Sequence, residues 1–412
     1  MTRHEPATPA EGAAGDELPG TATALIHHAY EAPGGFAAVP VGVHKASTVL
    51  FDSVAALRSH GWLDKTRYTY GLHGTPTTFT LEARLATLEG GRHALLTPSG
   101  LAAIALVDQA LAGRGDAVVL PDNVYAPSRN LALNELARWG IAHRFYDPME
   151  PASLESVLGP DTAIVWIEAP GSVTLEFPDA SSLVRAVRAR APRAAVALDI
   201  TWSAGLAYDA FDLGEGDGAD VTVHALTKYP SGGADLLMGS VVTRSRDLHE
   251  RLAWTHGRLG LGVGANDAEL VLRGLATLPL RYAAQDATAR RIAAWAGQQS
   301  RIARVLHPPT PGSPGHEHWA RRCRGAASLV TLEFDPDVAP PRVDAFVDAL
   351  ALFGIGWSWA GPMSLAVPYS PQGLHRLGHA IRGPLVRLAI GLEDADDLIA
   401  DLERALGALG AA

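Results

Sequence analysis

Residues 220–233 read DVTVHALTKYPSGG, an apolar and β-branched run that ends abruptly at a lysine, an aromatic residue and a glycine-rich turn. Such a run predicts a buried strand that delivers the amine of Lys228 to its end. The chain contains only three lysines, and the other two are Lys45 and Lys65. A lysine, unlike an arginine, can act as a nucleophile when burial or a nearby cation lowers its pKa. Taken alone, the stretch fits equally well a lysine whose ammonium group reaches solvent from a strand end.

Length and composition describe a globular protein of two or three domains, with 412 residues, 47% hydrophobic and 19% charged. No apolar run reaches the roughly 18 residues that a membrane-spanning helix needs. The formal net charge of −10 argues against nucleic-acid binding, which requires a basic face. A single cysteine, Cys323, excludes an intramolecular disulfide and fits a reducing, cytoplasmic compartment. Residues 1–20 are polar, lack the pattern of a secretory signal, and are predicted to form a disordered tail.

The pattern between residues 92 and 245 alternates short apolar strands with amphipathic helices. This alternation predicts an α/β fold with a mostly parallel central sheet and helices on both faces. Ligands bind such sheets at the carboxyl ends of the strands. Strands are predicted at residues 94–97, 117–120, 142–145, 163–168, 195–199, 221–224 and 239–243. Helices are predicted at residues 100–111, 126–139, 151–158 and 180–190.

The segments on either side of this pattern differ from it. Residues 21–75 have too few periodic apolar positions for a core and are predicted to form an N-terminal arm that packs on another subunit. A large domain follows at residues 76–270, starting with a helix at 78–89. Residues 271–412 are predicted to form a smaller α+β domain. Long helices are expected over residues 246–300, strands near 328–334 and 385–390, and helices near 342–352 and 395–406.

Groups with useful chemistry follow several of the predicted strands. Residues 97–101, TPSGL, lead from a strand into a helix whose first N–H groups can hold a phosphate, although an ordinary turn has the same sequence. Tyr125 follows another strand, either as a packing residue or as a ring stacker. Asp199 ends a third strand, either as a cap or as the partner of a buried cation. Pyridoxal phosphate needs this set of groups together with a Schiff-base lysine such as Lys228. The sequence therefore predicts a pyridoxal-phosphate site.

The chain also resembles the Cys/Met-metabolism family of fold-type-I pyridoxal-phosphate enzymes, and within it the bacterial cystathionine β-lyases. The resemblance runs from about residue 40 to the C-terminus. It is carried by KASTVLF at residues 45–51, the arm motif YGLHGT at 70–75, EAPGS at 168–172, DITW at 199–202, ALTKY at 225–229, WSW at 357–359 and RLAIGLED at 387–394. It implies an aminotransferase-like fold with a central sheet, a smaller C-terminal domain and an N-terminal arm.

The resemblance also implies roles around the cofactor. Lys228 bonds to pyridoxal phosphate and then shuttles protons, and Asp199 pairs with the pyridine nitrogen. Tyr125 stacks on the ring and assists deprotonation of the incoming amine. The backbone of Gly100 and Leu101 holds the phosphate group.

Further roles concern the substrate and the neighbouring subunit. The hydroxyl of Thr227 also holds the phosphate, and Tyr70 reaches the phosphate and substrate site of a neighbouring subunit. Arg387 binds the substrate α-carboxylate as a bidentate fork, helped by Ser358. Trp359 forms a wall of the substrate pocket.

The activity implied is a carbon–sulfur β-lyase that cleaves L-cystathionine to homocysteine, pyruvate and ammonia in methionine biosynthesis. The enzyme is expected to be a cytoplasmic homotetramer, built as a dimer of dimers. Gly171-Ser172 and the Ser358-Trp359 pair favour β over γ chemistry. Three alternatives remain: a β-lyase for cysteine or another cysteine S-conjugate, a γ-lyase or γ-synthase, and a regulatory protein that senses the cofactor or sulfur amino acids.

Three positions depart from the family pattern. Leu72 stands where the family carries an arginine that reaches the neighbour's phosphate. Ile200 stands where an asparagine usually follows the aspartate. Pro362-Met363 replaces a turn with a glutamate near the expected substrate mouth, so the distal half of the substrate is the least determined feature.

Overall fold

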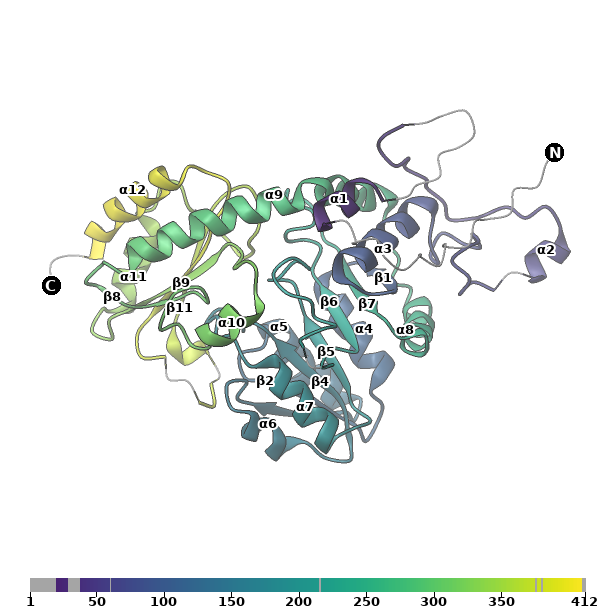
Figure 1. Ribbon diagram of the computed structural model, residues 1–412, viewed down its shortest axis with the longest axis horizontal. Coiled ribbons are helices and arrows are strands. Elements are labelled where there is room, and N and C mark those ends of the chain that lie inside the picture. Colours follow the sequence, from purple (N-terminus) through teal and green to yellow (C-terminus); the bar gives the residue numbers. More distant parts are fainter. Residues whose placement is uncertain are drawn as a thin grey trace.

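The computed structural model describes residues 20–28, 38–59, 61–214, 216–374, 376–378 and 381–409. The tail predicted at residues 1–20 lies outside them, apart from its last residue. Figure 1 shows two lobes that are joined along one edge by the long helix α9 (Ala265–Ala296). A segment that carries the short helix α2 (Val54–Ser59) projects away from both lobes. Within the described ranges, no helix is long and apolar enough to cross a membrane.

The large lobe is built on a seven-stranded sheet in the order β1-β7-β6-β5-β4-β2-β3. Strands β2 to β6 run parallel to one another, whereas β7 is antiparallel to β1 and β6, so the predicted mostly parallel sheet is confirmed. Each of the seven predicted strands lies within an observed one. The strands are β1 (His93–Thr97), β2 (Ala117–Pro121), β3 (Ala142–Tyr146), β4 (Thr162–Glu168), β5 (Ala195–Asp199), β6 (Val221–His224) and β7 (Gly239–Thr243).

Helices cover both faces of this sheet, and for this reason most of its strands are apolar runs without alternation, the edge strand β3 being the exception. One face packs against α4 (Gly100–Leu111) and α8 (Arg246–Leu259). The other packs against α3 (Pro76–Glu89), α7 (Ala180–Arg190) and the first half of α9. The remaining helices of this lobe are α5 (Ala126–Leu131) and α6 (Pro151–Val157). A π-helical turn at Ala132–Leu136 interrupts the single helix predicted over residues 126–139.

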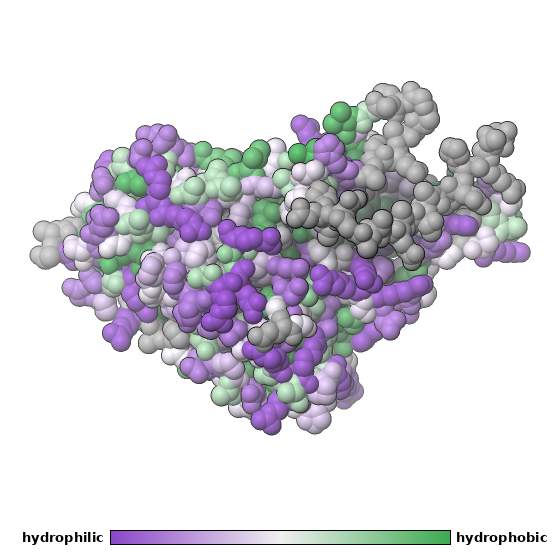
Figure 2. Space-filling view, in the orientation of Figure 1, coloured by the Kyte–Doolittle hydropathy of each residue, from purple (hydrophilic) through white to green (hydrophobic). Residues whose placement is uncertain are grey.

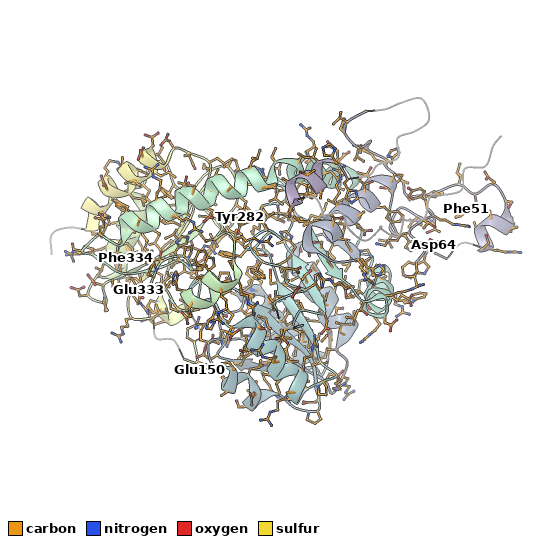
Figure 3. The ribbon with its side chains drawn as sticks, in the orientation of Figure 1. Phe51, Asp64, Glu150, Tyr282, Glu333 and Phe334 are labelled. Atoms are coloured by element: carbon orange, nitrogen blue, oxygen red, sulfur yellow. The ribbon has the colours of Figure 1, made fainter. Side chains whose placement is uncertain are left out.

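The second lobe contains a five-stranded sheet in the order β10-β11-β12-β9-β8. Its strands are β8 (Ile302–Leu306), β9 (Leu329–Phe334), β10 (Gly354–Ile355), β11 (Leu365–Tyr369) and β12 (Leu385–Ala389). One face packs on the second half of α9, on α11 (Pro340–Asp348) and on α12 (Ala395–Leu406). On that face Phe334 meets Phe346 at 5.5 Å between ring centroids, whereas its neighbour Glu333 pairs with Arg304 (both β9 residues are labelled in Figure 3). The opposite face is therefore free to carry polar groups toward the large lobe.

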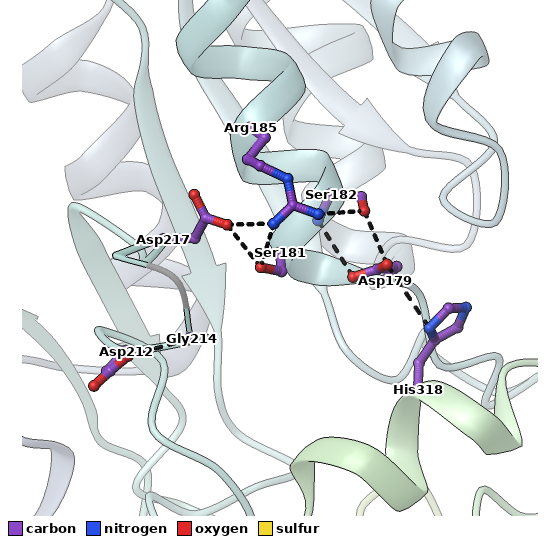
Figure 4. Close-up of polar contacts among 8 residues, drawn as sticks. All are labelled: Asp179, Ser181, Ser182, Arg185, Asp212, Gly214, Asp217 and His318. Atoms are coloured by element: carbon purple, nitrogen blue, oxygen red, sulfur yellow. Dashed lines mark hydrogen bonds and ion pairs between the residues drawn. The ribbon is translucent and has the colours of Figure 1, made fainter.

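Helix α10 (His316–Arg322) ties the second half of the chain to the large lobe. His318 Nδ1 lies 3.9 Å from Asp179 Oδ2, and Asp179 in turn caps the first turn of α7 (Figure 4). One turn further along α7, Arg185 pairs with Asp217 at 2.6 Å, and Ser181 donates to the same carboxylate. The start of α7 is thus held by a polar network that spans three segments of the chain.

The segment predicted to be an arm has two parts. Helix α1 (Thr21–Ile26) packs on the large lobe through Leu25, which is buried in the core. Beyond it, Leu50 and Val54 are exposed, at 91% and 62%, and contribute to no core cluster of the described residues. Lys65 fixes the base of this segment by donating to Glu82 of α3. The residues around α2 therefore project from the lobe, as an arm would.

Hydrophilic side chains cover most of the face seen in Figure 2. Hydrophobic ones gather along its upper edge, where α9 runs in Figure 1.

Candidate active site

Lys228 lies in the turn that follows β6, at the carboxyl end of the sheet. Its Nζ atom donates a hydrogen bond to Ser358 Oγ at 2.9 Å and lies 5.6 Å from the centroid of the Trp359 ring. Burial, with the Arg387 guanidinium as a second cause, lowers the pKa of Lys228 to about 8, and Asp199 opposes the shift. A useful fraction of the amine is neutral near neutral pH, which favours the nucleophile over a lysine that reaches solvent.

Asp199 ends β5 and is half-buried. Burial raises its pKa, while hydrogen bonds from Thr201 and the charges of His224 and Lys228 act in the opposite direction. The Thr201 N–H donates to Asp199 Oδ1 at 2.9 Å, and the Thr201 hydroxyl accepts from the backbone of Ala225 at 3.0 Å. Within the described residues Asp199 has no ion-pair partner. It is therefore an acid that a cationic ring nitrogen would stabilise.

The start of α4 touches the loop that leads to Lys228. A Cβ atom at Gly100 would lie 2.6 Å from the Cβ of Ala225, so this approach requires glycine. The first N–H groups of a helix, here those of Gly100 and Leu101, have no partner within the helix and form its positive end. Thr227 lies beside them, and its hydroxyl accepts from the Met238 N–H at 3.1 Å. The arrangement suits a phosphate group.

Tyr125 is the residue that begins α5, and its ring is 43% exposed. Its backbone N–H donates to Glu168 Oε1 at 2.8 Å. Burial raises the pKa of its phenol, and the carboxyl groups of Asp199 and Glu168 add to the shift. The hydroxyl therefore keeps its proton in this structure, and the exposed ring is available for stacking.

Arg387 enters the site from β12 of the second lobe and is only 8% exposed. Its Nη2 donates to the Ser358 carbonyl at 3.4 Å, and its Cζ lies 5.6 Å from the ring centroid of Tyr369. The Nε atom has no hydrogen-bond partner among the described residues, although it is buried. A buried guanidinium with a free donor is a fork suited to a carboxylate. Ser358 itself has a φ of 141°, a strained backbone of the kind found at binding sites.

Nine of the ten predicted site residues fall in this region. The exception is Tyr70, whose described contacts are the hydroxyl of Ser47, a bridge to Thr48 and the ring of His73. No described contact joins it to the Lys228 site of its own chain. Its role in a neighbouring subunit remains a prediction.

Two residues of the site, Glu168 and Tyr369, were not predicted from the sequence to be site residues. Glu168 contacts Tyr125. The sequence feature that could have identified it is the same as for Asp199, a carboxylate at the end of an apolar strand. Tyr369 lies over Arg387, and no local pattern marks it, because it approaches from a neighbouring strand of the second sheet.

The departures from the family pattern lie in different surroundings. Ile200 is 2% exposed and packs in the core of the large lobe, so its side chain faces away from the site. Leu72 packs toward Gly262, where a Cβ atom would lie 3.0 Å from it. Met363 is 56% exposed, in the turn in which the Pro362 carbonyl accepts from the Leu392 N–H. Of the three changes, only Pro362-Met363 can alter an exposed surface of the second lobe near the site.

The assembled residues fit pyridoxal phosphate. The structure offers a buried amine at Lys228, a half-buried acid at Asp199 that forms no ion pair with a described residue, a helix start at Gly100 that approaches the loop before Lys228 as only glycine can, and an exposed ring at Tyr125. Pyridoxal phosphate requires these four groups: an amine for its aldehyde, an acid for its ring nitrogen, a helix start for its phosphate and an aromatic ring to stack on its ring face.

Comparison with known proteins gives consistent matches. The family model "Cys/Met metabolism PLP-dependent enzyme" matches residues 22–407. The chain is 38% identical to a putative cystathionine β-lyase of Rhizobium johnstonii, over 92% of this chain and 93% of that protein. It is 35% identical to the cystathionine β-lyase of Escherichia coli, over 88% and 91%. A cystathionine γ-synthase of Xanthomonas oryzae pv. oryzae, crystallised with aminoacrylate and cysteine, has a TM-score of 0.85 at 30% identity, over 95% and 99%.

Proposed function

Since this chain belongs to the Cys/Met-metabolism family of pyridoxal-phosphate-dependent enzymes, we propose that it is a carbon–sulfur β-lyase that cleaves L-cystathionine to homocysteine, pyruvate and ammonia. Membership confirms the cofactor predicted from the strand ends. The observation that carries the proposal is that Ser358 contacts both Lys228, the candidate base, and Arg387, the candidate carboxylate fork. A substrate held by Arg387 presents its α-carbon to the amine of Lys228.

Pyridoxal phosphate, when bound, supplies a protonated ring that draws electrons from the substrate's α-carbon. Lys228 Nζ takes the α-proton, which its lowered pKa allows, and can return it. Asp199 holds the negative charge that keeps the ring nitrogen protonated. The bond between Cβ and sulfur then breaks, sulfur leaves with the electron pair as a thiolate, and water hydrolyses the remaining three-carbon fragment to pyruvate and ammonia.

The second lobe orients the substrate in this scheme. Arg387 fixes the α-carboxylate, and the Tyr369 ring packs against its guanidinium group. Ser358 holds Lys228 within reach through its hydroxyl. These contacts make the reaction effectively unimolecular, and holding both groups in place is a main source of the rate.

The β-lyase assignment is supported by the two relatives named cystathionine β-lyase and by Gly171-Ser172. A γ-synthase fold neighbour shows that the same architecture also serves γ chemistry. A second candidate is a β-lyase for another cysteine thioether. It is favoured by the surface near Arg387, where Trp357 is 76% exposed and meets Tyr369 edge to face at 5.8 Å. This aromatic rim, with Met363 on the same lobe, suits an apolar substituent on sulfur.

A product assay tests the proposal. Purified protein is incubated with L-cystathionine, and keto acids and thiols are identified by chromatography. Pyruvate with homocysteine supports β-elimination, whereas 2-oxobutyrate with cysteine contradicts it. S-Benzyl-cysteine and cystine, run in parallel, separate the two β-lyase candidates by their kcat/KM. A Lys228→Ala variant is the control, and it should show neither keto acid nor the visible absorption band that borohydride bleaches.

We also propose that the protein works in the cytoplasm as a homotetramer. The exposed apolar residues Leu50 and Val54 on the projecting arm support self-association, since such side chains gain free energy by burial in an interface. Tyr70 on the same arm would complete the site of the neighbouring subunit.

A further inference from the structure

Glu168 and Asp199 are register partners at the ends of the adjacent parallel strands β4 and β5. In-register residues of neighbouring strands point to the same face of a sheet, so the two carboxyl groups lie side by side. Glu168 is buried and Asp199 is half-buried, and no described residue forms an ion pair with Glu168. Two adjacent carboxyl groups in such a place cannot both carry a charge, because each desolvated anion repels the other.

Glu168 also holds the loop that carries Tyr125. Its Oε1 accepts the Tyr125 N–H at 2.8 Å. Four residues after Glu168, the Ser172 N–H donates to the carbonyl of Asn123 at 3.0 Å. Between them, a Cβ atom at Gly171 would lie 1.8 Å from Asn123 Nδ2, so the two loops are packed as closely as their backbones allow. The position of Tyr125 therefore depends on the end of β4.

We propose that Glu168 is a positioning residue of the active site: its carboxyl group fixes the backbone of Tyr125 and shares a single negative charge with Asp199. The inference rests on the proposed function, because it assumes that Tyr125 stacks on the cofactor and that Asp199 faces its ring nitrogen. Glu168 itself touches neither substrate nor cofactor in this assignment. It acts through its two neighbours.

The surroundings decide which of the two carboxyl groups keeps the proton. Burial, and then the charge of Asp199, raise the pKa of Glu168 well above its ordinary value, although backbone hydrogen bonds from Tyr125 and Ser172 oppose the shift. Asp199 receives hydrogen bonds from Thr201 and has in addition the electrostatic interactions with His224 and Lys228, which favour its anion. Glu168 therefore remains neutral and Asp199 carries the charge. The titratable groups that face Glu168 are Asp199, Tyr125, Tyr146 and Tyr208.

Two substitutions separate the two roles of Glu168. Glu168→Gln is neutral at every pH and keeps an oxygen that accepts the Tyr125 N–H. Glu168→Leu has a similar size and removes that acceptor. We expect E168Q to retain the cofactor affinity and the pH dependence of its absorption band. We expect E168L to weaken cofactor binding by roughly tenfold to a hundredfold, because a buried N–H loses its partner.

The same variants give a readout that needs no activity. The unfolded chain ionises Glu168 near its ordinary pKa, while the folded protein keeps it protonated, so the folded state binds more protons and loses stability as pH rises. E168Q removes this loss. Its melting temperature, measured with and without cofactor, should exceed that of the natural protein. The difference should grow between pH 5 and pH 8, with the pH dependence expected of a single titrating carboxyl group. Glu135→Gln, at an exposed carboxylate of the same lobe, is the matched control and should show no such trend.

Opposite results would overturn the inference. An E168Q variant that loses cofactor affinity as E168L does, or whose stability gain does not grow with pH, shows that Glu168 acts as an anion. An E168L variant with natural cofactor affinity shows that the Tyr125 contact is dispensable. Failure of the natural protein to form keto acids from any thioether would instead contradict the proposed function, and the stability trend of E168Q would still test the shared charge.

Discussion

The Nζ atom of Lys228 donates a hydrogen bond to the Oγ atom of Ser358 at 2.9 Å, and this contact joins the two lobes at the candidate active site. Lys228 follows a strand of the large sheet, whereas Ser358 belongs to the second lobe and has a strained backbone with φ of 141°. The same serine accepts from Arg387 through its carbonyl. Ser358 therefore contacts both Lys228, the candidate base, and Arg387, the candidate ligand of the substrate carboxylate.

The lowered pKa of Lys228 predicts how fast the cofactor-free protein captures pyridoxal phosphate. Only the neutral amine attacks an aldehyde, so the rate should rise with pH and level off near a pKa of about 8. An unshifted lysine would give a rate that continues to rise above pH 10. Stopped-flow absorption of the cofactor-free protein from pH 6 to pH 10 measures this, with Lys228→Ala as the unreactive control. A rate that still climbs at pH 10 would contradict the assigned environment of the amine.

Substitution of Arg387 should raise KM for the amino-acid substrate. Arg387→Leu removes the carboxylate fork, and we expect kcat/KM to fall by roughly a hundredfold or more. Arg387→Lys keeps the charge but not the planar pair of donors, so its loss should be smaller, about tenfold. Steady-state kinetics with L-cystathionine give both values. An unchanged KM in the leucine variant would show that the α-carboxylate binds elsewhere.

Tyr125 should contribute to cofactor binding through its ring rather than its hydroxyl. Tyr125→Phe keeps the ring, and its cofactor dissociation constant should stay close to the natural value. Tyr125→Ala removes the stacking surface and should raise the constant by roughly tenfold. Both variants should fold, because the side chain is 43% exposed. Equal losses in the two variants, measured by equilibrium dialysis, would assign the contribution to the hydroxyl group.

A buried ion cluster between the lobes should contribute strongly to stability. Arg376 Nη1 pairs with Glu176 at 2.8 Å and its Nε lies 3.3 Å from Asp122, with all three side chains at most 8% exposed. Arg376→Met leaves two buried carboxylates without their cation and should cost about 3–5 kcal/mol of unfolding free energy. Urea denaturation measures the loss. Arg138→Met, at an exposed ion pair, is the control and should cost about 1 kcal/mol or less.

The assignment of Tyr70 to a neighbouring subunit predicts complementation. Tyr70→Ala and Lys228→Ala each damage every site when expressed alone. In mixed oligomers some sites combine the intact Tyr70 of one chain with the intact Lys228 of another. Random assembly should restore about a quarter of the natural sites. Keto-acid formation by the mixture at the level of the Tyr70→Ala protein alone would place Tyr70 in the site of its own chain or outside any site.

Most strands of the large sheet could be predicted from sequence because they are buried on both faces and are therefore short apolar runs. The edge strand β3 is only partly buried, and all seven segments predicted between residues 94 and 243 are found in the sheet. In the second lobe only β9 and β12 were predicted. Strand β8 carries an exposed Ala303 and Arg304 at the sheet edge, β11 contains Pro368, and β10 has two residues, so none of them has a strand-like pattern.

The candidate site divides in the same way. Lys228, Asp199 and Tyr125 follow predicted strands, and the rule that ligands bind at strand ends identifies them. Arg387, Ser358 and Trp359 come from a separate lobe, and only the family resemblance connected them to the others. Glu168 was missed as a site residue, although it ends a strand as Asp199 does, because its contact with Tyr125 depends on the path of two loops.

Helix α9 has a consequence for protein engineering. Its first half buries Leu275 and Leu278 in the core of the large lobe, and its second half buries Ile292 and Ala293 in the core of the other. A domain boundary after residue 270, as the sequence pattern suggests, falls inside this helix. Chimaeras that exchange one lobe between related enzymes therefore inherit half of a helix from each parent if they are joined there, and each core receives side chains selected for a different partner.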